Sequence, residues 1–179
     1  MILSDKKILE EIAKGNIVIE PFDKECLRGN SYDVHLGKNL AFYVDKILDV
    51  KKHNKLKHFE IPSRGFVLRP NELYLGVTEE YTESHKHVPF LDGKSGVGRK
   101  GIHIHATAGR GDIGFCNHWT LELTVKKPVT VYSGMAIGQL YYVNVDGKIL
   151  VPYNKKGSAK YTGRLPFPVE SMLWKNFGK

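Results

Sequence analysis

Short runs of β-type residues, separated by turn residues, follow one another along most of this 179-residue chain. Each run is rich in Val, Ile, Leu, Thr or aromatic residues and is bounded by Gly, Pro, Asn, Asp or Ser, as strands commonly are. The runs are residues 16–20, 31–36, 40–44, 65–68, 73–78, 101–106, 119–125, 129–132 and 137–143. No regular alternation of strands with helices is present, which argues against a doubly wound parallel sheet. The pattern predicts an all-β fold, either a barrel or a jelly roll.

One short amphipathic helix is expected near the N-terminus. Ser4 is a suitable N-cap, and Gly15 is a suitable residue to end the helix. Between them, Ile8, Leu9 and Ile12 recur at helical spacing and form an apolar stripe. We expect this helix to cover the core.

Two other segments depart from the strand pattern. Residues 45–60 are largely polar and rich in Lys and His, so an exposed excursion is expected there. Residues 152–179 combine Lys, Gly, Pro and aromatic residues, which predicts a flexible C-terminal arm with a terminal turn at residues 170–177. The whole chain, residues 1–179, is expected to be one domain.

The composition limits the cellular setting and the partners. With only two cysteines, Cys26 and Cys116, a disulfide framework is not expected. The N-terminus turns charged at once, and no stretch approaches the roughly 20 apolar residues of a membrane span. We therefore expect a cytoplasmic protein that contacts no membrane. The net charge is +8, yet the basic residues beside glycines favour a compact phosphate group over a nucleic acid.

The sequence from Asp92 to Gly101, Asp-Gly-Lys-Ser-Gly-Val-Gly-Arg-Lys-Gly, places four glycines, one serine and three cations in ten residues. Glycines let backbone N–H groups approach a phosphate closely, and cations neutralise it. A P-loop would need a glycine where Val88 stands, so that motif is excluded. The loop is either a phosphate-binding turn or a glycine-rich hairpin with solvated cations.

A second glycine-rich turn follows at Thr107-Ala-Gly-Arg-Gly-Asp-Ile-Gly114. Asp112 is available there for a sugar hydroxyl or for a hydrogen bond within the turn. Glu122 then lies on a strand in which Trp119, Leu121, Leu123 and Val125 share the opposite face, so Glu122 points away from the core. Such a carboxyl is either a solvent-facing strand residue or a general acid and base.

Taken in order, these blocks resemble the dCTP deaminase family of the trimeric dUTPase superfamily. The resemblance rests on residues 93–101, 107–114, the Leu121-Glu122 pair, Gly134-Met-Ala-Ile-Gly-Gln139 and Pro152-Tyr153 with Lys160-Tyr161. The early Ser31-Tyr-Asp-Val-His-Leu-Gly37 is also similar to a strand of the family. The resemblance implies a distorted, jelly-roll-related β-barrel, a homotrimer, and a C-terminal lid that closes over bound nucleotide.

The resemblance also implies roles for individual residues. Glu122 matches the catalytic glutamate, and Ser95 and Arg99 match residues that hold the reactive water and the developing charge at C4 of cytosine. Backbone groups at Thr120 and Leu121 would read the base. The other residues implied to contact substrate are Lys94, Gly96, Val97, Gly98, Arg110, Asp112, Gln139, Tyr153, Lys160 and Arg164.

Three positions depart from the family pattern. Lys94 stands where the family often has arginine, which loses the bidentate fork toward phosphate. Gly96 replaces a serine, and Arg164 replaces a glutamine of the lid. These departures concern the phosphate and lid contacts, and leave Glu122, Ser95 and Arg99 as in the family.

The main expectation is a hydrolase that deaminates dCTP to dUTP and ammonia, with Mg²⁺ accompanying the triphosphate. The ligand set of a zinc deaminase is missing, since no Pro-Cys-x-x-Cys is present and two isolated cysteines cannot supply it, so no zinc and no protein metal ligands are expected in this reaction. His103 and His105 share a predicted strand face but lack a third ligand. Inhibition by dTTP is left open.

Gly109 indicates an alternative, a bifunctional enzyme that carries dCTP through to dUMP and diphosphate. Family members that release dUTP often have histidine at this position, and bifunctional ones often have Thr-Ala-Gly, as here. Arg110, Gly111 and Ile113 depart from the bifunctional pattern. A dUTP pyrophosphatase without deaminase activity, a non-catalytic nucleotide sensor and a basic nucleic-acid-binding domain are further alternatives.

Overall fold

The computed structural model describes residues 1–178, and the helix expected at the N-terminus is present as α1 (Asp5–Ala13). The Ser4 hydroxyl accepts a hydrogen bond from the backbone N–H of Lys7, which confirms the predicted N-cap. The predicted apolar stripe is wrong at Leu9, whose side chain is 37% exposed. Glu11 is fully buried on the inward face instead, because its carboxylate meets the buried His87 ring at 3.0 Å.

The remaining chain is mostly β-structure, as the strand pattern predicted. The strands are β1 (Ile17–Glu20), β2 (Leu27–Arg28), β3 (Ser31–His35), β4 (Asn39–Tyr43), β5 (Leu56–Glu60), β6 (Phe66–Leu68), β7 (Tyr74–Ser84), β8 (His87–Gly93), β9 (Ile102–His103), β10 (Phe115–Val125), β11 (Val129–Val131) and β12 (Ala136–Asn144). A second short helix, α2 (Ser95–Gly98), and three 3₁₀ turns, Lys24–Cys26, Tyr153–Lys155 and Leu173–Asn176, complete the set.

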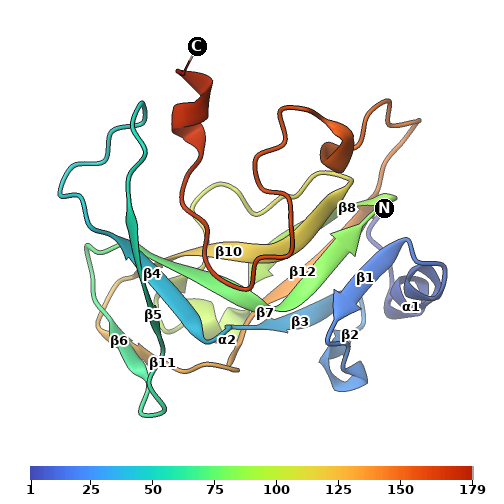
Figure 1. Cartoon of the computed structure of the whole chain (residues 1–179). Coiled ribbons are helices and arrows are strands. Elements are labelled where there is room, and N and C mark those ends of the chain that lie inside the picture. The colour runs from blue at the N-terminus through green and yellow to red at the C-terminus, as the bar shows by residue number, and fades with distance from the viewer. Residues whose placement is uncertain (179) are drawn as a thin grey trace.

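The strands form three antiparallel sheets. The largest has six strands in the order β5-β4-β7-β10-β9, with β1 pairing on β7. A four-stranded sheet has the order β2-β3-β12-β8, and β6 pairs with β11. Within residues 1–178 the strand pairings do not close into a barrel. The predicted mostly-β fold is confirmed, and the predicted closed barrel is not found. In Figure 1 the long strands β7 and β10 cross the middle of the molecule, and the C-terminal segment runs in front of them.

Strand β8 was missed by sequence reasoning, since Pro89 interrupts its pattern. Proline lacks the N–H that a central strand must donate, so it is confined to strand edges. The structure agrees, because β8 lies at the edge of the four-stranded sheet and, among the strands of residues 1–178, pairs with β12 alone. Pro89 is opposite Tyr142 in that pairing.

Several strand boundaries also differ from the predictions, and the largest differences concern β5, β7 and β9 together with β10, which begins at Phe115 rather than at residue 119. Residues 45–60 are not wholly an excursion, because Leu56–Glu60 is β5, paired along its length with β4. Strand β7 continues past Thr78 to Ser84, since the buried Glu80 is stabilised by His35 and does not end the strand. Only Ile102–His103 of the predicted run 101–106 is a strand, so His103 and His105 do not share a strand face.

The C-terminal arm lies over the six-stranded sheet. Its backbone N–H groups at Leu165 and Val169 donate to Asn117 Oδ1 at 3.0 Å and to Thr120 Oγ1 at 3.2 Å, both on β10. The expected terminal turn is present as Leu173–Asn176. None of the helices described in residues 1–178 has the length and apolar character needed to cross a membrane.

Candidate active site

Glu122 occupies the outward face of β10, as its alternation predicted. Trp119, Leu121 and Leu123 are 6%, 0% and 0% exposed, whereas Glu122 is half-buried. The register with β7 shifts between His118 and Thr120, just before this stretch. Such irregularities re-aim side chains, and bulges are frequent next to active sites.

The backbone that follows β9 lies next to the Glu122 carboxylate. The N–H of Ala106 donates to Glu122 Oε2 at 3.4 Å, and the N–H of Glu122 donates to the carbonyl of Ile104 at 2.8 Å. Residues 104–106 therefore run alongside this part of β10. The free carboxylate oxygen remains available to a water or a substrate amine.

The glycine-rich loop is folded as a turn of helix, α2, fixed at both ends. Val97 is buried in the core, and the carbonyl of Gly101 accepts from the backbone N–H of Lys126 at 3.0 Å. Gly96 and Gly98 are exposed with open space around them, so the backbone there is accessible. The predicted contact residues Gly96, Val97 and Gly98 thus form one exposed turn anchored by a single apolar side chain.

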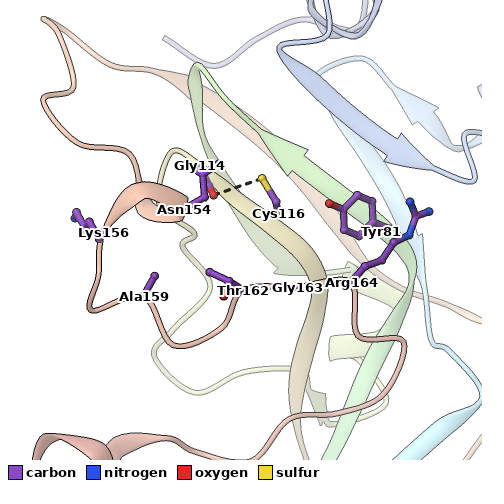
Figure 2. A pocket seen from close by; sticks show the side chains of 9 residues that line it. All are labelled: Tyr81, Gly114, Cys116, Asn154, Lys156, Ala159, Thr162, Gly163 and Arg164. Atoms are coloured by element: carbon purple, nitrogen blue, oxygen red, sulfur yellow. Dashed lines mark hydrogen bonds between the residues drawn. The ribbon is translucent and has the colours of Figure 1, made fainter.

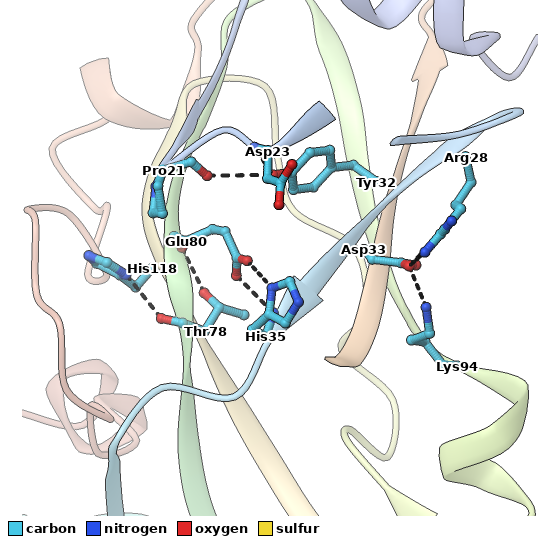
Figure 3. Close-up of polar contacts among 10 residues, drawn as sticks. All are labelled: Pro21, Asp23, Arg28, Tyr32, Asp33, His35, Thr78, Glu80, Lys94 and His118. Carbon is cyan, nitrogen blue, oxygen red and sulfur yellow. Dashed lines mark hydrogen bonds and ion pairs between the residues drawn. The ribbon is translucent and has the colours of Figure 1, made fainter. Parts of the chain in front are cut away.

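Lys94 is tied to the four-stranded sheet by Asp33, a residue for which sequence reasoning proposed no role (Figure 3). Lys94 Nζ lies 2.5 Å from Asp33 Oδ2, and the Arg28 guanidinium lies 2.7 Å from the same oxygen. Burial opposes ionisation of Asp33, but these two cations outweigh it and lower the pKa of Asp33 below its ordinary value. One negative charge faces two positive charges, so a single positive charge remains uncompensated at this edge of the loop.

Ser95 and Arg99 are both exposed, next to the turn that holds Lys94. Within residues 1–178 no hydrogen bond or ion pair joins either of them to Glu122. The chain therefore does not by itself bring the three predicted catalytic side chains into contact. The predicted roles of Ser95, Arg99 and Glu122 stay predictions.

The turn at residues 107–114 packs tightly on β8. The N–H of Leu91 donates to the carbonyl of Gly109 at 2.6 Å. A Cβ atom at position 109 would lie 2.6 Å from His105 Nε2 and 2.8 Å from the backbone oxygen of Leu91. A side chain at position 109 would force the Leu91 backbone or the His105 ring to shift, so glycine suits this path of the chain.

The other residues predicted in this region are accessible. Arg110 is exposed and forms an isolated β-bridge with Phe90. Asp112 is also exposed, and its backbone carbonyl accepts a hydrogen bond from the Phe115 N–H at 3.0 Å. Gln139 is half-buried on β12, in register with Asp33 on one side and Asp92 on the other. It accepts from the Ser31 hydroxyl at 3.4 Å.

The arm residues predicted to reach the nucleotide are engaged within the chain. The Tyr153 hydroxyl accepts from the backbone N–H groups of Lys160 and Tyr161, at 3.2 and 2.9 Å, which folds residues 153–161 into a closed loop. The Lys160 ammonium donates to Asn176 Oδ1. Arg164 pairs with Glu20 and lies over the Tyr81 ring, 4.3 Å from its centroid.

The arm also lies close to the Glu122 face. Tyr43 Oη on β4 accepts from the backbone N–H of Ser171 at 3.0 Å. Burial raises the pKa of Tyr43 despite the hydrogen bond from Ser171, and the nearby carboxylates of Glu170 and Glu122 add to the rise. The backbone N–H of Val169 donates a hydrogen bond to Thr120, so the arm covers strand β10 two residues from Glu122. This placement suits a segment that excludes water from a bound nucleotide.

A second buried acid lies on β7 (Figure 3). Glu80 accepts from the His35 ring at 2.6 Å and from the His35 backbone N–H at 2.9 Å. Burial raises the pKa of Glu80, although the hydrogen bonds from His35 oppose the rise. Thr78 Oγ1 donates to the Glu80 carbonyl and accepts from the Trp119 N–H, so this network connects β3 and β7 to the start of the Glu122 segment.

Comparisons with known proteins show the family to which the chain belongs. A family described as dCTP deaminase-like matches residues 2–145. A protein of Clostridium acetobutylicum named dCTP deaminase, dUMP-forming, is 46% identical over 99% of this chain and 99% of its own length. A Leptospira biflexa protein of the same name is 43% identical over 100% of this chain and 99% of its own.

Among solved structures, the 2′-deoxycytidine 5′-triphosphate deaminase of Agrobacterium tumefaciens has the same fold. It superposes with a TM-score of 0.62 at 20% identity, over 79% of this chain and 47% of that one. The family match covers most of the chain and the relatives cover nearly all of it. The protein therefore belongs to the dCTP deaminase family, as its ordered motifs predicted.

Proposed function

We propose that this protein is a bifunctional enzyme that converts dCTP to dUMP, ammonia and diphosphate. The observation that carries the proposal is the fit of glycine at position 109, together with two relatives above 40% identity that are named dUMP-forming. The comparisons thus favour the alternative over our main expectation, in which dUTP is released. Gly111, one of the three residues that argued against the alternative, has a packing reason of its own, because a Cβ atom there would lie 2.8 Å from the Trp119 ring and 3.0 Å from the Pro89 ring.

In the first step, water attacks C4 of cytosine and the exocyclic amine leaves as ammonia, which gives dUTP. Glu122 takes a proton from the water and delivers it to the leaving amine, in the manner of general acid–base catalysis. Its half-buried position on β10 and its free carboxylate oxygen support this role. Ser95 and Arg99 orient the water and stabilise the charge at C4.

In the second step, water attacks the α-phosphorus of dUTP and diphosphate leaves, which gives dUMP. The exposed turn at Gly96–Gly98, with Lys94 and Arg99 at its ends, presents backbone N–H groups and positive charge to the phosphates. Arg110, Tyr153, Lys160 and Arg164 add to that binding. Asp112 holds the deoxyribose, and Gln139 and the backbone at Thr120 and Leu121 lie beside the nucleotide.

We also propose a homotrimer in which neighbouring copies complete each site. The supporting observation is that Ser95 and Arg99 are exposed and, within residues 1–178, form no hydrogen bond or ion pair with Glu122. Mg²⁺ would enter with the triphosphate. In residues 1–178 neither Asp92 nor Asp112 belongs to a cluster of three metal-ligating side chains, so phosphate oxygens would hold the ion. Inhibition by dTTP remains a prediction.

The test supplies dUTP alone, with Mg²⁺, and measures dUMP and diphosphate. A bifunctional enzyme hydrolyses added dUTP, because the second step starts from that nucleotide. The matched reaction with dCTP measures ammonia. Ammonia from dCTP without hydrolysis of dUTP would reject the second step and keep the first.

A further inference from the structure

Three side chains with metal-binding atoms lie close together at the end of β7. None of the three is among the candidate active-site residues. Glu83 is on β7, His85 follows the end of that strand, and Cys116 is the register partner of Glu83 on β10. Their carboxylate oxygen, ring nitrogen and sulfur all lie within 4.8 Å of one another. Alternation along β7 places Glu83 and His85 on one face, and the cross-strand pairing brings Cys116 to the same face.

The carboxylate of this cluster is held in place by its neighbours. Tyr81 Oη donates to Glu83 Oε1 at 2.7 Å, and the His85 ring lies 2.6 Å from Glu83 Oε2. These two contacts orient the Glu83 carboxylate toward the cluster, as the surroundings of a metal ligand commonly do.

The cluster is also reachable from solvent. Cys116 lines a cavity of about 290 Å³ together with Tyr81 and the arm residues Asn154, Thr162 and Arg164 (Figure 2). His85 lines a second cavity, of about 630 Å³. Within residues 1–178 the thiol makes one hydrogen bond, which it donates to the carbonyl of Gly114 at 3.4 Å. An ion can thus enter without rearrangement of the strands.

We propose that Glu83, His85 and Cys116 bind a divalent transition-metal ion, for which Zn²⁺ is the best chemical match. Carboxylate, imidazole and thiolate are the ligands that zinc takes at 2.0–2.3 Å, and a thiolate disfavours Mg²⁺ and Ca²⁺. The fourth position is open toward the cavity that Cys116 lines.

The charges fit the same ion. One carboxylate and one thiolate balance a divalent cation, and a neutral imidazole leaves the centre without net charge. Lys156 and Arg164 line the same cavity, and they would repel a centre with a net positive charge. The site joins the end of β7 to the start of β10 beside the arm, so bound metal is expected to stabilise this end of the sheet.

The first experiment titrates chelator-treated, metal-free protein with Co²⁺ and records the absorption spectrum. A thiolate-to-cobalt charge-transfer band and the intense visible bands of a tetrahedral centre are expected, and both should disappear when Zn²⁺ displaces Co²⁺. Cys116→Ser should abolish the charge-transfer band. Cys26→Ala is the matched control, because Cys26 is the other free cysteine and is buried away from the cluster, so the band should persist.

A second measurement uses competition with a chromophoric chelator to give the Zn²⁺ affinity. His85→Gln, an exposed position that the fold tolerates, should weaken binding by at least about 10-fold, and Tyr81→Phe by about 10-fold through the lost orientation of Glu83. Circular dichroism of each metal-free variant checks the fold. An absent band in the wild-type protein, a band retained in Cys116→Ser, or an unchanged affinity in His85→Gln would overturn the proposal.

Discussion

Lys94 Nζ lies 2.5 Å from the buried Asp33 carboxylate, so the first cation of the glycine-rich loop is fixed to strand β3. Arg28 reaches the same oxygen from β2, at 2.7 Å. The loop that is proposed to bind phosphate is therefore positioned by a contact between segments far apart in the sequence. The contact also leaves one positive charge uncompensated, which suits an anionic ligand.

Replacing Asp33 with asparagine should lower the free energy of unfolding by about 2 kcal/mol at neutral pH, because the hydrogen bonds lost are those between charged groups. Urea unfolding measures the change. Glu60→Gln is the matched control, since it breaks the Lys38–Glu60 pair, in which both side chains are 66% exposed. That pair should contribute less than about 1 kcal/mol. Equal effects of the two substitutions would contradict the role given to Asp33.

The difference in stability between the wild type and Asp33→Asn should depend on pH in a set direction. The folded-state pKa of Asp33 is lowered, whereas an aspartate in the unfolded chain titrates near 3.9. The contribution of Asp33 is therefore complete above about pH 5 and is lost as the pH falls through the lower folded-state value. Urea unfolding of both proteins between neutral and acidic pH tests this. A difference that grows on acidification would show that the sign is wrong.

Gly109→Ala should destabilise the protein by about 1–3 kcal/mol, because a Cβ atom there meets the Leu91 backbone oxygen at 2.8 Å and the strand cannot easily move away. Gly29→Ala is the comparison, since no atom lies within 4 Å of the Cβ that it would add. Thermal unfolding of both variants should show a loss of stability only for Gly109→Ala. Equal melting temperatures would mean that glycine is not required at position 109.

Glu122→Gln should reduce the rate of ammonia release by about 10²-fold or more, the range typical of a lost general acid and base. Nucleotide binding should change little, because the amide keeps the shape of the carboxyl group. Single-turnover kinetics with dCTP and a separate binding titration distinguish the two effects. Glu60→Gln, on the edge strand β5, controls for loss of surface charge. Retained turnover in Glu122→Gln would remove that residue from the mechanism.

Much of the fold could be predicted from local pattern. The cap at Ser4, the alternation around Glu122 and most strands follow from residue type and period. The failures have tertiary causes. Pro89 is tolerated because β8 is an edge strand, and the charged Glu80 stays within β7 because His35 stabilises it inside the molecule.

The candidate site shows the same limit. The residues of the glycine-rich turn and Glu122 could be selected by motif, and the structure places them on α2 and β10. The contact of Asp33 with Lys94 depends on which strands become neighbours, and so does the approach of Cys116 to Glu83. Neither residue spacing nor composition predicts which strands become neighbours.

The stoichiometry of products from dCTP tests the central claim most directly. One incubation with dCTP and Mg²⁺, sampled over time, would measure ammonia, diphosphate, dUMP and dUTP together. A bifunctional enzyme should release ammonia and diphosphate in equal amounts, with dUMP as the final nucleotide. Ammonia accompanied by accumulating dUTP and no diphosphate would contradict it.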